Sequence, residues 1–333
     1  MMWLGLLSSS FAAGAWCDGA FAVSTSDGVV VFRDGEGQRL TTGAQTTALG
    51  WQPDCRRLAV ASSALFLFDF HFGEEDPKFR TTLDDSHVSG TGPRAERIVW
   101  YEDSLAYIEH GTRPELRILD ATAMTWVSVA QTTQAVTDLA LSGPRSGSFV
   151  LGEKMLWRFD PDKTIMVYMA KRVAVHPETE ALEGPSHDLT IGGAPFAEPV
   201  LLVGLSADGA RALVRLDPVS YGPYASVSTS GARTTFGIGP NPQRVDEGWA
   251  SDGSFLVGPS QGQLVRDDGA GSRTELGVLM DEVAEVHINE DGSRVAVVKT
   301  DGSVVFVDLA DQPSRSNTAA APIPPPMHIE TTP

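Results

Sequence analysis

Short apolar runs, separated by turn-forming residues, recur along the chain. In residues 283–309, Asp291-Gly292 and Asp301-Gly302 each lie between two runs that are rich in β-branched residues. Asp-Gly between alternating apolar runs is the strongest short-range signal for a β-hairpin. The segment therefore predicts three strands, at about 284–288, 294–298 and 303–307.

Six further copies repeat this pattern, in which an apolar residue precedes an aspartate and a run of Val, Leu or Ala follows. They centre on Asp18, Asp54, Asp103, a point near residue 144, Asp208 and Asp252. With Asp291, the mean spacing is about 45 residues, which is typical of propeller blades with three or four strands. We therefore expect an all-β fold, a seven-bladed β-propeller that forms a single domain over residues 1–310.

One interval fits the period poorly. About 64 residues separate the copy near residue 144 from the one at Asp208, against a mean of about 45. The interval contains either a long insertion, at about 161–200, or an eighth blade around residues 165–175. An eight-bladed ring therefore stays open as the alternative.

Two stretches carry a resemblance to a known family. Gln52–Ser62 (QPDCRRLAVAS) and Asn289–Val298 (NEDGSRVAVV) resemble the central part of WD40 and WD40-like repeats. The Gly-His and Trp-Asp pairs of that family are absent, and apolar-Asp pairs such as Phe68-Asp69 and Val307-Asp308 take the place of Trp-Asp. The resemblance implies a bacterial subunit that organises one or more other proteins, for example within an ATPase-containing assembly.

The N-terminal segment has two interpretations. Because a propeller avoids a free sheet edge by pairing its termini, Trp3–Leu7 is expected to close the last blade as a fourth strand. The alternative is a signal peptide over residues 1–16. No Lys or Arg precedes the apolar stretch, and three serines interrupt it. A structural strand and a cytoplasmic location are therefore expected, with a secreted or periplasmic location as the less favoured alternative.

Three stretches break the repeat, near residues 72–95, 161–200 and 217–246, and residues 311–333 form a Pro/Ala-rich tail that we expect to be disordered. Solvated connections are the simplest interpretation of the loops, and a free end that of the tail. Alternatively, the tail docks into a partner, and the loops contact a partner through aromatic and acidic side chains. The candidate contacts are Tyr221, Tyr224, Phe236, Glu74, Glu75 and Asp76.

Charge narrows the choice of partners. The 333 residues include 25 Lys plus Arg and 43 Asp plus Glu, so the formal net charge is −18. A surface this acidic repels phosphate backbones, which makes nucleic acid a poor candidate, and it favours basic protein partners. No apolar run reaches the length of roughly 18 residues that a spanning helix needs, so no membrane contact is expected.

The sequence offers little catalytic chemistry. The two cysteines, Cys17 and Cys55, are too few for a disulfide scaffold or a multi-cysteine zinc site. Cys55 occupies the glycine position of its turn, so a structural role is favoured over an activated thiol. The seven histidines show no helical metal spacing, and His187-Asp188 is explained by chance adjacency. They are His71, His87, His110, His176, His187, His287 and His328.

No catalytic, cofactor-binding or metal-binding residue is therefore proposed at this stage, and no cofactor is expected. Asp267-Asp268-Gly269 and Glu290-Asp291-Gly292 offer oxygen donors but lack the ligand spacing of a calcium loop. We interpret the repeated acidic and glycine residues as structural turn residues. These are Asp18, Gly19, Asp54, Asp103, Asp208, Gly209, Asp252, Gly253, Asp291 and Gly292.

The favoured function is a non-catalytic scaffold for protein–protein interaction, as a subunit of a multiprotein assembly. The alternative is a hydrolase-like, lactonase-like or lyase enzyme that holds a metal in the central channel of the propeller. A third, weaker alternative is a secreted propeller that binds sugars or peptides. Which face binds, the stoichiometry and the identity of the partner stay open.

Overall fold

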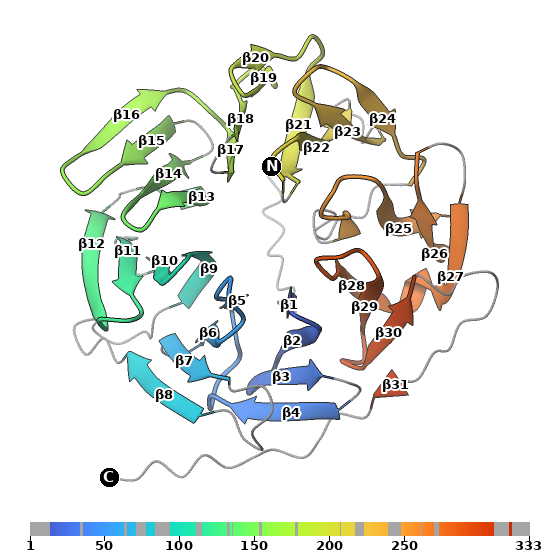
Figure 1. The fold of residues 1–333 in the computed structure, drawn as a ribbon, viewed down its shortest axis with the longest axis horizontal. Coiled ribbons are helices and arrows are strands. Elements are labelled where there is room, and N and C mark those ends of the chain that lie inside the picture. Colours follow the sequence, from blue (N-terminus) through green and yellow to red (C-terminus); the bar gives the residue numbers. More distant parts are fainter. Residues whose placement is uncertain are drawn as a thin grey trace, which may run out of the picture.

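Eight β-sheets, which we call blades 1 to 8, surround a central axis with the first strand of each blade nearest the centre (Figure 1). The computed structural model describes residues 14–33, 36–62, 65–70, 78–83, 94–110, 115–131, 134, 136–152, 155–176, 179–206, 208–216, 223–238, 248–260, 262–269, 273–309 and 320–321. Statements below concern these residues.

Each blade is an antiparallel meander in chain order. Blade 1 contains β1 (Gly14–Cys17), β2 (Ala20–Thr25), β3 (Gly28–Arg33) and β4 (Glu36–Thr41), and blade 2 contains β5 (Ala48–Trp51), β6 (Arg57–Ala61), β7 (Leu65–Asp69) and β8 (Lys78–Leu83). Blade 3 contains β9 (Arg94–Tyr101), β10 (Ser104–His110), β11 (Glu115–Asp120) and β12 (Thr125–Gln131). Blade 4 contains β13 (Val136–Gly143), β14 (Ser146–Leu151), β15 (Met155–Phe159) and β16 (Thr164–Tyr168).

The second half of the ring follows the same plan. Blade 5 contains β17 (Arg172–His176), β18 (Thr179–Glu183), β19 (Leu189–Ile191) and β20 (Ala194–Pro195), and blade 6 contains β21 (Val200–Leu205), β22 (Arg211–Leu216), β23 (Tyr224–Ser228) and β24 (Arg233–Thr235). Blade 7 contains β25 (Leu256–Ser260), β26 (Gln263–Asp267) and β27 (Arg273–Leu279). Blade 8 contains β28 (Val283–Ile288), β29 (Arg294–Lys299), β30 (Val304–Asp308) and β31 (Ala320–Ala321). In blade 7, a bridge between Trp249 and Leu256 takes the place of the inner strand.

The expected all-β propeller is confirmed, and the ring has the eight blades of the alternative rather than seven. The additional blade is blade 5, which lies in the interval where the repeat was too long. The 3-10 helix η2 (Met280–Glu282) precedes the last blade. Within the described ranges, no helix is long and apolar enough to cross a membrane.

The hydrophobic core is divided among the seams between neighbouring blades. Eight clusters of buried side chains are present, and each joins residues of two adjacent blades. Strand β6 shows why: Leu58 and Val60 pack against blade 1, whereas Ala59 and Ala61 pack against blade 3. Since successive side chains of a strand point to opposite faces, both faces of each sheet are buried.

The turns between the first and second strands, which we call AB turns, repeat one geometry in blades 2, 6, 7 and 8. In blade 8, the Gly292 N–H donates to Asn289 O, and the Ser293 N–H donates to the Asp291 carboxylate. The third residue of each turn has a positive φ and is Gly209, Gly253 or Gly292 in three blades. In blade 2 it is Cys55, at φ 61°, a left-handed conformation that glycine adopts without strain.

Tryptophans at the ends of inner strands connect neighbouring blades. The indole N–H groups of Trp16, Trp51 and Trp100 donate to the carbonyls of His287, Ala15 and Gly50, at 3.0, 3.2 and 2.8 Å. In the preceding blade, each acceptor lies one residue before the position that corresponds to the tryptophan. The inner strands of these blades therefore end at the same height along the central axis. Trp249 occupies the same position in blade 7, but its buried indole nitrogen has no hydrogen-bond partner among the described residues.

A disulfide joins Cys17 of blade 1 to Cys55 of blade 2, with a Cα–Cα distance of 5.4 Å. The sequence analysis excluded a disulfide scaffold but did not anticipate this single bond. The two cysteines are 38 residues apart, and only the ring geometry brings their AB turns together. The disulfide therefore staples one seam of the propeller.

The expected closing strand, Trp3–Leu7, lies outside the described residues. At the outer edge of blade 8, Ala320 and Ala321 pair with Val305 and Val304. The tail beyond residue 310, which the sequence analysis expects to be disordered, therefore supplies the outermost strand of blade 8 at these two residues. Two alanines suffice because the outermost strand needs only backbone hydrogen bonds.

The disulfide gives the first testable prediction. Cys17→Ser should lower the free energy of unfolding by about 3–4 kcal/mol, because the opened chain gains loop entropy. Cys55→Gly opens the same bond but supplies glycine at the left-handed position, so it should lose about 1 kcal/mol less. Urea unfolding measures both values. Added reductant should destabilise the wild type alone, and an unchanged wild type under reductant would contradict the bond.

The tryptophans give the second prediction, from a matched pair. Trp100→Phe leaves the Gly50 carbonyl without its indole donor, whereas Trp249→Phe removes an N–H that has no described partner. Both variants lose similar apolar area, so the first should be less stable than the second by about 1 kcal/mol. Thermal unfolding of both variants in one buffer tests this, and equal losses would show that the indole bond is energetically neutral.

Candidate functional site

The AB turns of neighbouring blades contact one another on one face of the ring. The disulfide joins the turns of blades 1 and 2, and the Gln52 side-chain amide donates to the Asp103 carboxylate at 2.5 Å between blades 2 and 3. The Ser251 hydroxyl donates to the Glu290 carbonyl between blades 7 and 8. These contacts join the AB turns of blades 1, 2 and 3 to one another and the AB turn of blade 7 to that of blade 8.

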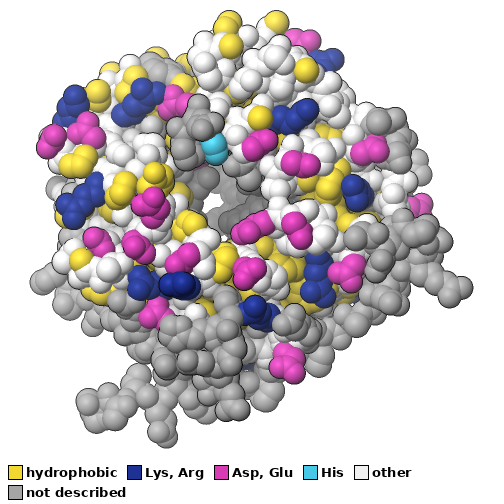
Figure 2. Space-filling view, in the orientation of Figure 1, with side chains coloured by type: hydrophobic (Ala, Val, Ile, Leu, Met, Phe, Trp, Pro, Cys, Tyr) yellow, Lys and Arg dark blue, Asp and Glu magenta, His cyan; other side chains and the backbone are white. Residues whose placement is uncertain are grey.

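Exposed carboxylates concentrate on these turns and form what we call the carboxylate ring. Figure 2 shows acidic side chains gathered around the central opening of the face that it presents. Arg56 and Arg145 lie in the same turns, and Arg56 is 3.8 Å from Asp54. The ring members, all exposed, are Asp18, Asp54, Glu102, Asp103, Asp208, Asp252, Glu290 and Asp291.

Hydrogen bonds within the turns keep several of these aspartates ionised. The Ser206 hydroxyl donates to Asp208, and this bond lowers the pKa of that carboxyl below its ordinary value. Bonds from Ser293 lower the pKa of Asp291 in the same way. These groups therefore carry full negative charge at neutral pH.

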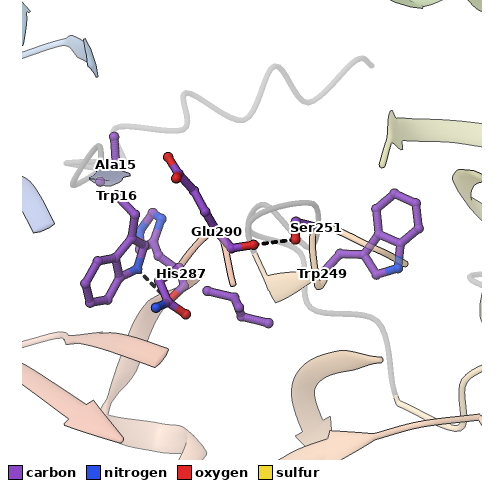
Figure 3. A pocket seen from close by; sticks show the side chains of 9 residues that line it. Ala15, Trp16, Trp249, Ser251, His287 and Glu290 are labelled. Atoms are coloured by element: carbon purple, nitrogen blue, oxygen red, sulfur yellow. Dashed lines mark hydrogen bonds between the residues drawn. The ribbon is translucent and has the colours of Figure 1, made fainter. Parts of the chain in front are cut away.

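A cavity of about 250 Å³ opens where the inner strands of blades 1 and 8 meet the AB turn of blade 7 (Figure 3). Trp16 and His287 lie on one side of it and Trp249 on the other, with Glu290 and Ser251 between them (Figure 3). Aromatic walls beside a carboxylate suit the side chain of a lysine or arginine, which combines an apolar stem with a cationic head.

Glu290 differs electrostatically from its neighbours. Burial raises the pKa of its carboxyl above the ordinary value of 4.5, and the charges of Asp18 and Asp291 raise it further. The ionised form is therefore disfavoured in the folded protein. A cation placed against Glu290 would relieve that repulsion.

Behind the cavity, a buried ionisable pair supports its wall. Glu285 and His287 are both 3% exposed, and their side chains are 3.0 Å apart. The His287 ring lies over Gly14, where an added Cβ would be 2.5 Å from its Nε2 atom. Only glycine leaves room for the ring at that point.

Groups with metal-ligand chemistry are few among the described residues. One set of three such side chains lies within binding distance, Cys17, Cys55 and Glu290, and both of its sulfurs belong to the disulfide. Asp267, from one of the loops considered for calcium, is 1% exposed. Its carboxylate accepts the N–H groups of Gly237 and Gly269, so its oxygens are used within the fold.

A second polar cluster lies at the turn between β18 and β19, outside the carboxylate ring. Lys171 Nζ is 2.9 Å from His187 Nε2, and His187 Nδ1 is 2.6 Å from Glu183. Because a lysine ammonium can only donate, Nε2 accepts and Nδ1 carries the proton toward Glu183. The second Glu183 oxygen accepts the Leu202 N–H of blade 6 at 2.8 Å, so the cluster joins blades 5 and 6.

Two of the proposed partner contacts are corrected. Tyr224 is 4% exposed and Phe236 is not exposed, and both pack in the cluster between blades 6 and 7. They cannot present rings to a partner. Tyr221 and the acidic triplet Glu74, Glu75 and Asp76 lie outside the described residues.

The proposed turn residues lie where the repeats placed them, at the AB turns. Among the histidines, His287 is buried and His176 and His187 are partly exposed. The sequence analysis treated the turn aspartates only as structural residues. It did not predict that the closed propeller places them together on one face. Their equivalent positions in successive repeats were the signal for that assembly.

Comparison with solved structures finds the same fold at low sequence identity. Kluyveromyces lactis Hsv2 is 14% identical, with a TM-score of 0.55 over 79% of this chain and 92% of its own. A chain of a mitotic checkpoint complex is 12% identical, with a TM-score of 0.52 over 90% and 87%. The computationally designed Ika8 protein is 10% identical, with a TM-score of 0.59 over 91% and 98%.

The fold is that of a β-propeller. At these identities the likeness concerns the fold alone, and at that level it confirms the resemblance seen in the sequence. No family model matches the sequence, and no curated protein matches it.

Glu290 gives the third prediction. Because its pKa is raised in the folded state, wild-type stability falls as the pH rises from 4.5 through the raised pKa. Glu290→Gln should therefore increase the free energy of unfolding at neutral pH and have no such effect in acid. Asp291→Asn should show the opposite sign at neutral pH, because the pKa of Asp291 is lowered. Urea unfolding across this pH range measures both, and a gain for Asp291→Asn would contradict the assignment.

Proposed function

We propose that this protein is a non-catalytic scaffold that binds a basic partner through the carboxylate ring. The observation that carries the proposal is the placement of eight exposed carboxylates on AB turns around one mouth of the propeller, where several turns are bonded to a neighbouring turn. Complementary charge of this kind speeds association and selects partners by sign.

The rigidity of the face supports this function. A scaffold gains affinity when its binding groups need no ordering on association. The AB turns meet that condition, since their aspartates are held by backbone N–H groups and the turns by disulfide and side-chain bonds. An ATPase-containing assembly, which the resemblance implies, is a setting in which such a subunit would act.

The cavity beside Glu290 refines the partner's chemistry. Its aromatic walls and single disfavoured carboxylate suit one lysine or arginine side chain, while the surrounding carboxylates attract the rest of a basic segment. The partner we propose is therefore a protein with a lysine-rich or arginine-rich exposed segment.

We also propose a location for the protein in the cell. A buried disulfide is typical of proteins from oxidising compartments and rare in the cytoplasm. It supports the secreted or periplasmic alternative over the cytoplasmic one. Trapping free thiols in intact cells and then digesting the protein would decide between them, since a cytoplasmic protein would show Cys17 and Cys55 alkylated.

The fourth prediction tests the carboxylate ring. A fluorescent lysine-rich peptide should bind the wild type with an affinity that falls steeply with salt. The triple variant Asp208→Asn, Asp252→Asn and Asp291→Asn keeps the turn acceptors but removes three charges, and it should bind about tenfold more weakly with a shallower salt dependence.

The control is Asp301→Asn. Asp301 makes the same bond to the N–H two residues ahead, but in the turn between β29 and β30, which lies at the opposite end of blade 8 from its AB turn. Its peptide affinity should match the wild type. A triple variant that binds as tightly as the wild type would refute the proposed face.

A further inference from the structure

The outer rim of blade 4 exposes apolar side chains in an unusual concentration. Ile165, Met166, Val167 and Met169 are 47%, 54%, 36% and 56% exposed. They lie on or next to β16, the outermost strand of its sheet. Val127, which is 40% exposed, lies on β12, the outermost strand of the neighbouring blade (Figure 1).

The outward edge of β16 pairs with no strand among the described residues, since its sheet ends there. Natural proteins usually protect such an edge with charges or proline. The outer strands β4, β8, β24 and β27 each carry at least one Arg, Lys or Glu, whereas β16 (Thr164–Tyr168) has no charge and no proline, as is also true of β12 and of the two-residue β31. The edge of β16 therefore has no charged side chain, and its outward backbone groups face no partner strand among the described residues.

A cleft accompanies this edge. A cavity of about 480 Å³ lies between Ile118, Val127 and Val129 of blade 3 and the turn that leads into β16, and its lining also includes Arg145, Asp160, Asp162 and Lys163. Met166 pairs with Trp157, which packs in the cluster between blades 3 and 4, so Met166 lies on the side of β16 that faces this cleft. Its volume falls within the range of roughly 300–1,000 Å³ typical of ligand pockets.

We propose that the free edge of β16 accepts an extended, uncharged segment of a partner protein as a fifth strand of blade 4. The backbone of that segment would continue the ladder. Alternate apolar side chains would cover Ile165 on one face and pack on the other between Met166 and the apolar wall of the cleft at Val127 and Val129. This binding mode is distinct from that of the carboxylate ring, because it uses the backbone edge of β16 rather than the carboxylates of the AB turns.

A second copy of this chain fits the edge less well. The five residues of β16 span about 17 Å, and pairing two such edges covers far less than the roughly 800 Å² per partner of a standard interface. A second rim would not enter the cleft, and two chains with a net charge of −18 repel each other. A single extended segment without charge needs a smaller contact area and is not repelled by the acidic chain.

The fifth prediction uses the full chain and a short fluorescent peptide that alternates valine with threonine. The peptide should bind saturably and slow amide hydrogen exchange in β16. Met166→Lys should weaken binding by about tenfold, because it places a charge on the edge. The same peptide with a central proline, which cannot complete the ladder, should not bind.

Leu279→Lys is the matched control, since Leu279 is 53% exposed on β27, another outermost strand. It should leave peptide affinity unchanged, and neither variant should alter affinity for the lysine-rich peptide. Absence of saturable binding, or equal loss in the two lysine variants, would overturn the proposal. A concentration-dependent dimer in sedimentation that Met166→Lys abolishes would overturn it in favour of a second copy.

Discussion

Burial of both faces of every sheet is the constraint on which this structure depends. A blade such as β5–β8 carries apolar side chains on each face, and a linear stack of such sheets would leave its two terminal faces in water. Closure into a ring removes both terminal faces. The seam between blades 8 and 1, where Phe21 and Phe32 pack against Ala296 and Val298, is therefore equivalent to the others. Closure also explains why the strands are nearly continuous runs of Val, Leu and Ala rather than half-polar strands.

Polar bonds complete the seams in two chemically opposite ways. Around blades 8, 1, 2 and 3, indole N–H groups donate to backbone carbonyls of the preceding blade. Around blade 5, buried carboxylates accept backbone N–H groups of the following blade: Asp138 accepts from Val173, and Glu183 accepts from Leu202. Either choice satisfies a buried backbone group that the inner strand leaves unpaired. Blade 5, with strands of two to five residues, depends on these carboxylates because it has less apolar surface to bury.

The difference between blade 5 and the other blades also decides how much of the fold the sequence predicts. The Asp-Gly turns and tryptophans mark most blades, because both are local and repeated. Blade 5 carries neither mark: its first turn follows His176 without an Asp-Gly pair, so its strands merged with an expected insertion. The disulfide escaped because Cys17 and Cys55 occupy different positions within their repeats. Tyr224 and Phe236 were misplaced because a nearby run of Pro and Gly concealed the strand and core residues around it.

The carboxylate ring is partly a consequence of the fold. Four turn aspartates, in blades 2, 6, 7 and 8, accept the N–H two residues ahead, so an acid recurs wherever this turn geometry recurs. Glu102 and Glu290 do not follow from that rule. Glu102 holds a left-handed conformation at φ 50°, which costs a residue with a Cβ free energy, and burial together with the charges of Asp18 and Asp291 raises the pKa of Glu290. Neither carboxylate is needed for its turn, so the proposed binding of a basic partner gives both a role that the fold alone does not.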